Sequence, residues 1–165
     1  FGVVFAAVRH RLATRTDGRR SLFLAAAGFV AVSLVPFVKY PANPPSVGDP
    51  DTITRRTLLY LVILAWSVIG TWAAWRLARW LRDERQLPEE RWVPLAAIAF
   101  AVIIGAGLAG LPGSPDKVAA PATLIWRFRL AVAGGSAVFW ATLGLAFGLV
   151  AAPRTLPLKR RSVGE

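Results

Sequence analysis

The chain has 165 residues, of which 55% are hydrophobic and 18% are charged, and its formal net charge is +11. It contains neither cysteine nor methionine, which excludes disulfides, thiolate metal sites and thioether copper sites within this sequence. The apolar residues are gathered in long stretches with almost no charge, which argues against a soluble fold.

The first apolar stretch, residues 1–8, is too short to cross a bilayer alone, because a core of roughly 30 Å needs about 20 apolar residues in a helix. The sequence begins with Phe1 rather than methionine. We therefore expect residues 1–8 to be the end of an earlier membrane helix. The alternative is the remnant of a cleaved signal peptide.

Four longer stretches are predicted to cross the membrane as helices, at residues 21–38, 57–77, 93–111 and 130–152. They lack the periodic polar faces of helices in a soluble core. The prediction is an all-α polytopic transmembrane helix bundle with four complete spans plus the end of an earlier one, forming a single membrane domain over residues 1–165. Pro36 is expected to disturb the first complete span near its end.

Small residues recur four positions apart in two of these spans. The pairs are Gly105 with Ala109, Ala106 with Gly110, and Gly144 with Gly148. Because small residues let helices approach closely in lipid, these faces are expected to pack against other helices, either within the chain or between chains. The alternative is that alanine and glycine are simply abundant in this sequence.

The basic residues predict the orientation of the chain in the membrane. Most of the 20 lysines and arginines lie near residues 9–20, near residues 76–91, or after the last span. The positive-inside rule places these regions in the cytoplasm, which predicts a multi-pass protein of the cell membrane with a cytoplasmic C-terminus. The connectors 39–56 and 112–128 then face the outside.

The distribution of basic residues also indicates which partners the protein contacts. Basic residues at helix ends are typical of side chains that reach toward anionic lipid headgroups, and Trp72, Trp75, Trp80 and Trp92 accompany them as an interfacial aromatic belt would. A nucleic-acid site would need one continuous basic face. We therefore expect the lipid bilayer as a partner and no nucleic acid.

The residue types needed for common enzyme mechanisms are also missing. His10 is the single histidine and lies among arginines, whose field repels a metal cation. No histidine base can be assigned to Ser33, Ser67 or Ser136, and the HExxH, P-loop and dinucleotide-binding patterns are absent. The sequence therefore predicts no enzyme and no bound cofactor.

The polar connector from Lys39 to Arg56, KYPANPPSVGDPDTITRR, carries the strongest functional signal. Its prolines restrict the backbone, so a stiff segment is expected. Asp49 and Asp51 could cap the following helix, or they could offer hard oxygen ligands that bind a hydrated divalent cation weakly. We also expect Arg127 to pair with one of these aspartates, with simple snorkelling of Arg127 as the alternative.

Two segments resemble the CbtA family of probable cobalt transporter subunits. They are VPFVKYPANPPSVGDPDTITRRTLLY at residues 35–60 and LIWRFRLAVAGGSAVFWATLGLAFG at residues 124–148. The resemblance implies a membrane subunit of a cobalt importer linked to cobalamin metabolism, with cobalt as the transported ion. It also implies a small histidine-bearing companion of the CbtB type, and a homo-oligomer stays open.

The family motif defines the candidate site, where ion access or gating is expected rather than a tight metal cage. Its residues are Lys39, Tyr40, Pro41, Asn43, Pro44, Pro45, Asp49, Asp51, Trp126, Arg127 and Arg129. Asp49 and Asp51 are the candidate metal ligands. The alternative functions are a non-transporting membrane scaffold or assembly subunit and, less favoured, a small membrane enzyme acting on lipid.

Overall fold

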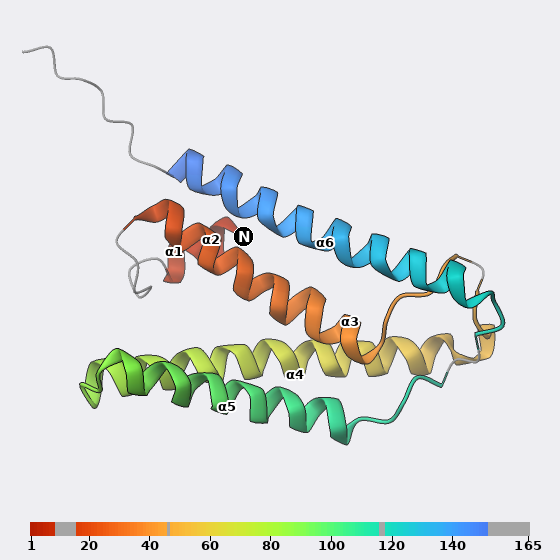
Figure 1. Cartoon of the computed structure of the whole chain (residues 1–165), viewed down its shortest axis with the longest axis horizontal. Helices are drawn as coiled ribbons and strands as arrows, with labels where there is room; N and C mark the ends of the chain where they lie inside the picture. Colours follow the sequence, from red (N-terminus) through yellow and green to blue (C-terminus); the bar gives the residue numbers. More distant parts are fainter. Residues whose placement is uncertain (9–15, 46, 116–117, 152–165) are drawn as a thin grey trace, which may run out of the picture.

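The computed structural model describes residues 1–8, 16–45, 47–115 and 118–151, which are mostly helical with no strand among them. Four helical segments are long and apolar enough to span a membrane: Asp17–Lys39, Pro50–Glu84, Glu89–Gly110 and Ala122–Ala151. This arrangement confirms the predicted all-α bundle (Figure 1). The basic region that contains His10 lies outside the described residues.

The first span is built from three consecutive pieces, α2 (Asp17–Gly28), η2 (Phe29–Leu34) and α3 (Val35–Lys39). The Thr16 side chain caps its start by accepting a hydrogen bond from the Arg19 backbone N–H. The η2 piece is a π-helix, in which the Val35 N–H donates to Val30 O. Pro36 lies in the first turn of α3, just after this π-helix. Proline lacks an N–H and crowds the preceding turn, so the disturbance predicted at Pro36 is the π-helical hydrogen bonding of η2.

The second and third spans form a helical hairpin. A short 3-10 helix, η3 (Pro50–Thr52), leads into α4 (Ile53–Arg79), which continues through a π-helical end, η4 (Trp80–Glu84). The chain then reverses and enters α5 (Glu89–Gly110), whose first turn carries Glu89 and Glu90, favourable near a helix N-terminus. Near the turn, Arg79 lies over the Trp75 ring at 5.2 Å and Arg85 over the Trp80 ring at 4.5 Å.

The last span is the single helix α6 (Ala122–Ala151), which starts directly after Pro121. It begins before Leu130, the predicted start, because the backbone stays helical through the polar Trp126–Arg129 segment. A short helix, α1 (Gly2–Val8), lies beside α2 and against α6, where Phe5 is buried. Residues 1–8 are thus helical.

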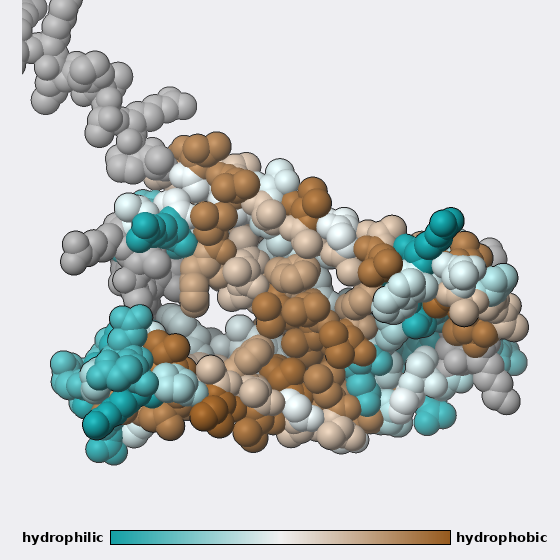
Figure 2. Space-filling view, viewed as in Figure 1, coloured by the Kyte–Doolittle hydropathy of each residue, from teal (hydrophilic) through white to brown (hydrophobic). Residues whose placement is uncertain are grey.

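The bundle consists of two packed pairs, α2–η2–α3 with α6 and α4 with α5 (Figure 1). The pairs meet where η2 and α3 contact α4, and Ser67 in α4 donates to Ala31 O across this contact. Val35, Ile63 and Ile104 form the buried apolar cluster there. Toward the α4–α5 turn the two layers diverge, and Figure 2 shows a hollow between them on this face.

Glycines set the close approach within each pair. A Cβ at Gly144 would lie 2.7 Å from Ala25 Cβ, and one at Gly148 would lie 3.1 Å from Gly18 Cα, so the predicted packing of Gly144 and Gly148 is confirmed and is internal to the chain. Gly105 and Gly110 face open space, so the pairs that they form do not pack within the described chain. Gly107 packs instead, directly under the Trp66 ring.

Candidate functional site

Lys39, the last residue of α3, is bonded to the end of α5. Its Nζ donates to the Leu108 and Leu111 carbonyl oxygens, both at 2.6 Å. The last carbonyls of a helix have no partner inside the helix, and the negative end of the helix dipole lies there. A lysine ammonium donates to these carbonyls and brings a positive charge to the negative end of the dipole. Lys39 therefore caps the C-terminal end of α5, a helix that begins at Glu89, 50 residues after Lys39.

Tyr40 bonds the loop that follows α5. Its hydroxyl donates to Pro112 O at 2.7 Å. The residue leaves the helical conformation, with φ −131° and ψ 76°, because the following Pro41 disfavours a helical conformation in the residue before it. Partial burial disfavours the charged phenolate and so raises the pKa of Tyr40 above its ordinary value.

Arg129 bonds the same connector to α6. Its guanidinium donates to Asn43 Oδ1 at 3.0 Å and to Ala42 O at 3.3 Å. We call Lys39, Tyr40, Ala42, Asn43 and Arg129 the clasp, because together they hold the connector ends of α3, α5 and α6 side by side. The link that we expected between Arg127 and an aspartate is therefore made by Arg129 and Asn43, while Arg127 and Trp126 are exposed.

The prolines and glycine of the connector shape the path between the clasp and η3. Pro44 is buried and its carbonyl accepts a hydrogen bond from the Val47 N–H at 3.1 Å, whereas Pro45 is exposed. Gly48 has φ 125°, a conformation that side chains other than glycine rarely adopt. The connector is thus held by local geometry as well as by its contacts with helices.

Asp49 caps the helix that follows the connector. Its Oδ1 accepts from the Asp51 N–H at 3.0 Å, and its carbonyl accepts from the Thr52 hydroxyl at 2.8 Å. Asp51 is exposed in the first turn of η3. Within residues 1–8, 16–45, 47–115 and 118–151, no group of three or more His, Cys, Asp or Glu could hold a metal ion. Of the two roles predicted for Asp49, capping is the one that this geometry supplies.

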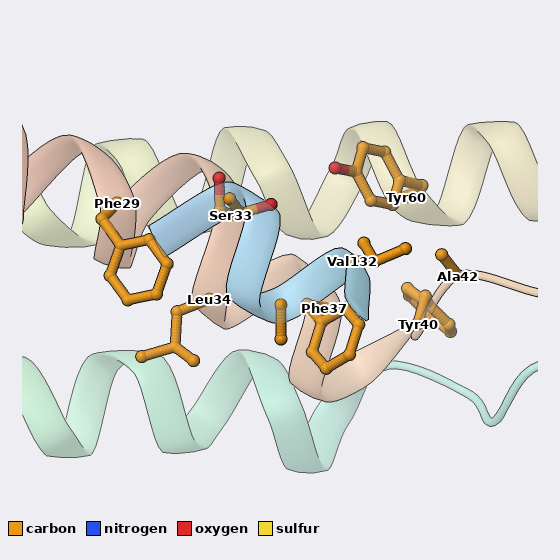
Figure 3. A pocket seen from close by; sticks show the side chains of 10 residues that line it. Phe29, Ser33, Leu34, Phe37, Tyr40, Ala42, Tyr60 and Val132 are labelled. Atoms are coloured by element: carbon orange, nitrogen blue, oxygen red, sulfur yellow. The ribbon is translucent and has the colours of Figure 1, made fainter. Parts of the chain in front are cut away.

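A cleft lies beneath the clasp, between η2–α3, α4 and α6 (Figure 3). It has two compartments of about 430 and 270 Å³ that share Tyr40, Ala42 and Tyr60 as walls. The larger compartment is mainly apolar. The smaller one lies against the connector and the start of α4, where Arg56 is the one charged residue among the described residues that line either compartment.

Hydroxyl groups are the polar elements of the larger compartment. They belong to Ser33, Tyr40, Tyr60 and Ser136. Ser33 accepts a hydrogen bond from Trp140 Nε1 at 2.9 Å, which ties η2 to α6 at the edge of the cleft. The sequence showed serines inside apolar spans, but only the packing of the spans identifies which of them share a cavity with the two tyrosines.

These features define a polytopic membrane protein whose helices enclose a partly polar cleft under a rigid connector, an architecture suited to a transport subunit. The profile of the family described as "Probable cobalt transporter subunit (CbtA)" matches residues 1–152. The chain belongs to the CbtA family, as the resemblance of residues 35–60 and 124–148 implied. Neither a curated protein nor a solved structure matches the chain significantly.

Proposed function

We propose that the chain is the membrane subunit of an importer that carries cobalt ions into the cell for cobalamin metabolism. The observation that carries this proposal is the position of the clasp, formed largely by the family motif, directly above the cleft. Lys39 and Tyr40 bond the end of α5 and the loop after it, and Ala42 and Asn43 bond Arg129 of α6. The state of the clasp therefore governs access to the cleft from the connector side. This is the position that a gate would occupy.

The chemistry of the cleft supports transient passage. Hydroxyl oxygens are hard ligands that suit hydrated divalent cations without binding them tightly. A passage needs weak, replaceable contacts, because an ion held in a cage would not leave. We therefore assign Tyr40, Tyr60, Ser33 and Ser136 to the path of the ion, and the clasp to gating.

The proposed setting follows the charge distribution of the sequence. The protein lies in the cell membrane with the connector outside and the C-terminus in the cytoplasm. A small histidine-bearing subunit of the CbtB type accompanies it, and that subunit supplies the imidazole ligands that are scarce in this chain, which has one histidine. Copies of the chain assemble further through exposed helix faces.

The decisive experiment measures uptake of radioactive cobalt in cells that lack the full-length gene, compared with cells in which it is restored. The restored gene should raise uptake, and a Lys39→Met variant with equal membrane abundance should raise it much less. Unchanged uptake at full membrane abundance would instead favour a scaffold or assembly subunit. Altered lipid composition with unchanged uptake would favour a lipid enzyme.

A further inference from the structure

The two cations of the clasp are bonded to neutral oxygens. Lys39 donates to two backbone carbonyls, and Arg129 donates to a backbone carbonyl and to the amide oxygen of Asn43. Neither Lys39 nor Arg129 has a carboxylate partner in the part of the chain that the structure describes. A hydrogen bond to a neutral acceptor leaves the charge of the donor in place, so the clasp adds two positive charges to the potential around the cleft.

The opposite end of the bundle differs in this respect (Figure 1). There the Asp83 carboxylate lies 2.6 Å from Arg82 Nε and 3.7 Å from Arg79 Nε, and so compensates both arginines. The acids of the connector are placed elsewhere, because Asp49 caps η3 and Asp51 is exposed in its first turn. Neither of these two aspartates lines a compartment of the cleft.

The smaller compartment is lined by groups that suit an anion. Arg56 lines it together with the side chains of Asn43 and Tyr60, and none of its described lining residues is an aspartate or a glutamate. A guanidinium presents a planar fork of N–H donors that matches the oxygens of a carboxylate or a phosphate. A space of about 270 Å³ beside Arg56 therefore has the donors and the sign of charge that an oxyanion needs.

The sign of the charge distinguishes between occupants of this compartment. A hydrated divalent cation would be repelled by Arg56 and by the two cations of the clasp, Lys39 and Arg129. A neutral occupant, such as an apolar chain or water, would gain nothing from these charges. An oxyanion is attracted by all three.

We propose that the smaller compartment binds an oxyanion through Arg56, between Tyr60 and the Tyr40–Asn43 wall. The bound oxyanion offsets the positive charge of the clasp, so that a divalent cation can enter the cleft beside it. This role rests on the proposed function, whereas the binding of the oxyanion does not. Two sources carry this chemistry: a soluble carboxylate that brings the metal as a chelate, and an anionic lipid headgroup whose chain lies against the apolar walls of the larger compartment.

The binding is tested with the full-length protein purified in a neutral detergent, so that no anionic lipid competes. Radiolabelled citrate and inorganic phosphate are followed by equilibrium dialysis, and both should bind saturably. Arg56→Gln should weaken their binding by about tenfold or more, because the charge-assisted hydrogen bonds are lost. Arg55→Gln, on the neighbouring exposed arginine that lines neither compartment, is the matched control and should change binding by less than about twofold. Arg56→Lys keeps the charge without the fork and should retain part of the binding, so the test does not depend on the folding of Arg56→Gln.

Two further ligands distinguish the sources of the oxyanion. Displacement of citrate by phosphatidylglycerol but not by phosphatidylcholine would assign the natural ligand to a lipid headgroup. Binding of cobalt–citrate at least as tight as that of citrate alone would assign it to a soluble chelate, and either result supports the site. The proposal is overturned if neither citrate nor phosphate binds saturably, or if Arg55→Gln weakens binding as much as Arg56→Gln does. It is also overturned if cobalt chloride binds saturably where the anions do not.

Cobalt uptake separates this proposal from the proposed function. If the restored gene raises uptake while the purified protein binds no oxyanion, the oxyanion site is wrong and the transport function stands. If citrate or phosphate binds through Arg56 while the restored gene raises no uptake, the oxyanion site stands and the transport function fails.

Discussion

The Arg129 guanidinium donates to Asn43 Oδ1 at 3.0 Å and so joins two residues that lie 86 positions apart in the chain. This bond links α6 to the connector, and Ala42 O accepts a further bond from the same side chain at 3.3 Å. A planar guanidinium can serve two acceptors at once in a way that an ammonium cannot. The pairing leads to the first of five predictions.

Arg129→Met and Asn43→Ala should each destabilise the protein, and the double variant should cost less than the sum of the two. The coupling free energy is expected to be about 1 to 2 kcal/mol, since the bond involves a charged donor. Thermal unfolding in detergent gives the values, and Arg127→Met, on an exposed side chain of the same helix, is the matched control. An additive double variant would show that the bond contributes nothing.

Lys39→Met should weaken the capped end of α5. The substitution removes the charged donor that bonds two backbone carbonyls, which is expected to lower the free energy of unfolding by about 1.5 to 3 kcal/mol. Hydrogen exchange should accelerate at the amides of the last turn of α5 and much less in α4. Arg55→Met removes an exposed positive charge near the same membrane surface and should leave this exchange unchanged. Faster exchange in both variants would point to a general charge effect instead.

The role of Asp49 is tested by two substitutions that differ in capping ability. Asparagine caps helices about as well as aspartate, whereas alanine costs about 0.5 to 2 kcal/mol. Asp49→Asn should therefore keep both stability and cobalt uptake, and Asp49→Ala should lose stability. If Asp49→Asn abolishes uptake while the protein stays folded, the carboxylate charge itself is required and the metal-ligand role regains support.

Gly28→Ala should disturb the contact between the first and last spans. The added Cβ would lie 2.3 Å from the Trp140 ring, a distance that forces the indole or the helix to move. Overpacking of this kind costs about 1 to 3 kcal/mol. Gly135→Ala, where nothing lies within 4 Å, is the control and should be neutral or slightly stabilising. Equal melting temperatures for the two variants would contradict the close approach seen here.

Tyr40 predicts a dependence on alkaline pH. Its pKa is raised above the ordinary value of 10.0 by burial, so the folded state holds the phenolic proton more tightly than the unfolded state. The corresponding stability is present below the unfolded pKa and is lost as pH rises through the raised folded pKa. Melting temperatures between about pH 8 and 11 should thus fall more steeply for the native chain than for Tyr40→Phe, given the ordinary tyrosine pKa near 10. Parallel curves would refute this.

The spans were predictable because membrane helices are defined by length and hydropathy, which are local properties of the sequence. Their ends were not, since α4 and α6 stay helical through polar segments that lie beyond the apolar core. Glu84 and Ala122 are therefore helical although the apolar pattern excludes them. Helical hydrogen bonds continue wherever the backbone permits, and hydropathy does not detect this.

The candidate site was predictable in its residues but not in its contacts. The family motif identified Lys39, Tyr40, Asn43 and Arg129, and all four make hydrogen bonds to segments distant in the chain. The acceptors of Lys39 and Tyr40 are backbone carbonyls, which carry no sequence signal. Arg127 was expected to pair with Asp49 or Asp51, whereas it is Arg129 that bonds the connector, at Asn43. The rotation of α6 decides which of the two arginines faces the connector, and the sequence does not give that rotation.

The π-helical segment η2 fixes the rotational phase of everything that follows it in the first span. A π-turn closes its hydrogen bond over one residue more than an α-turn, as the Val35 N–H to Val30 O bond shows. If all the residues between Phe29 and Leu34 were kept in an α register instead, the following residues would be turned by about 100°, the angle that each residue subtends in an α-helix. Lys39 would then point away from the carbonyls of α5. The one extra residue in the π-turn, in the middle of the membrane, thus determines the direction of the Lys39 side chain at the membrane surface.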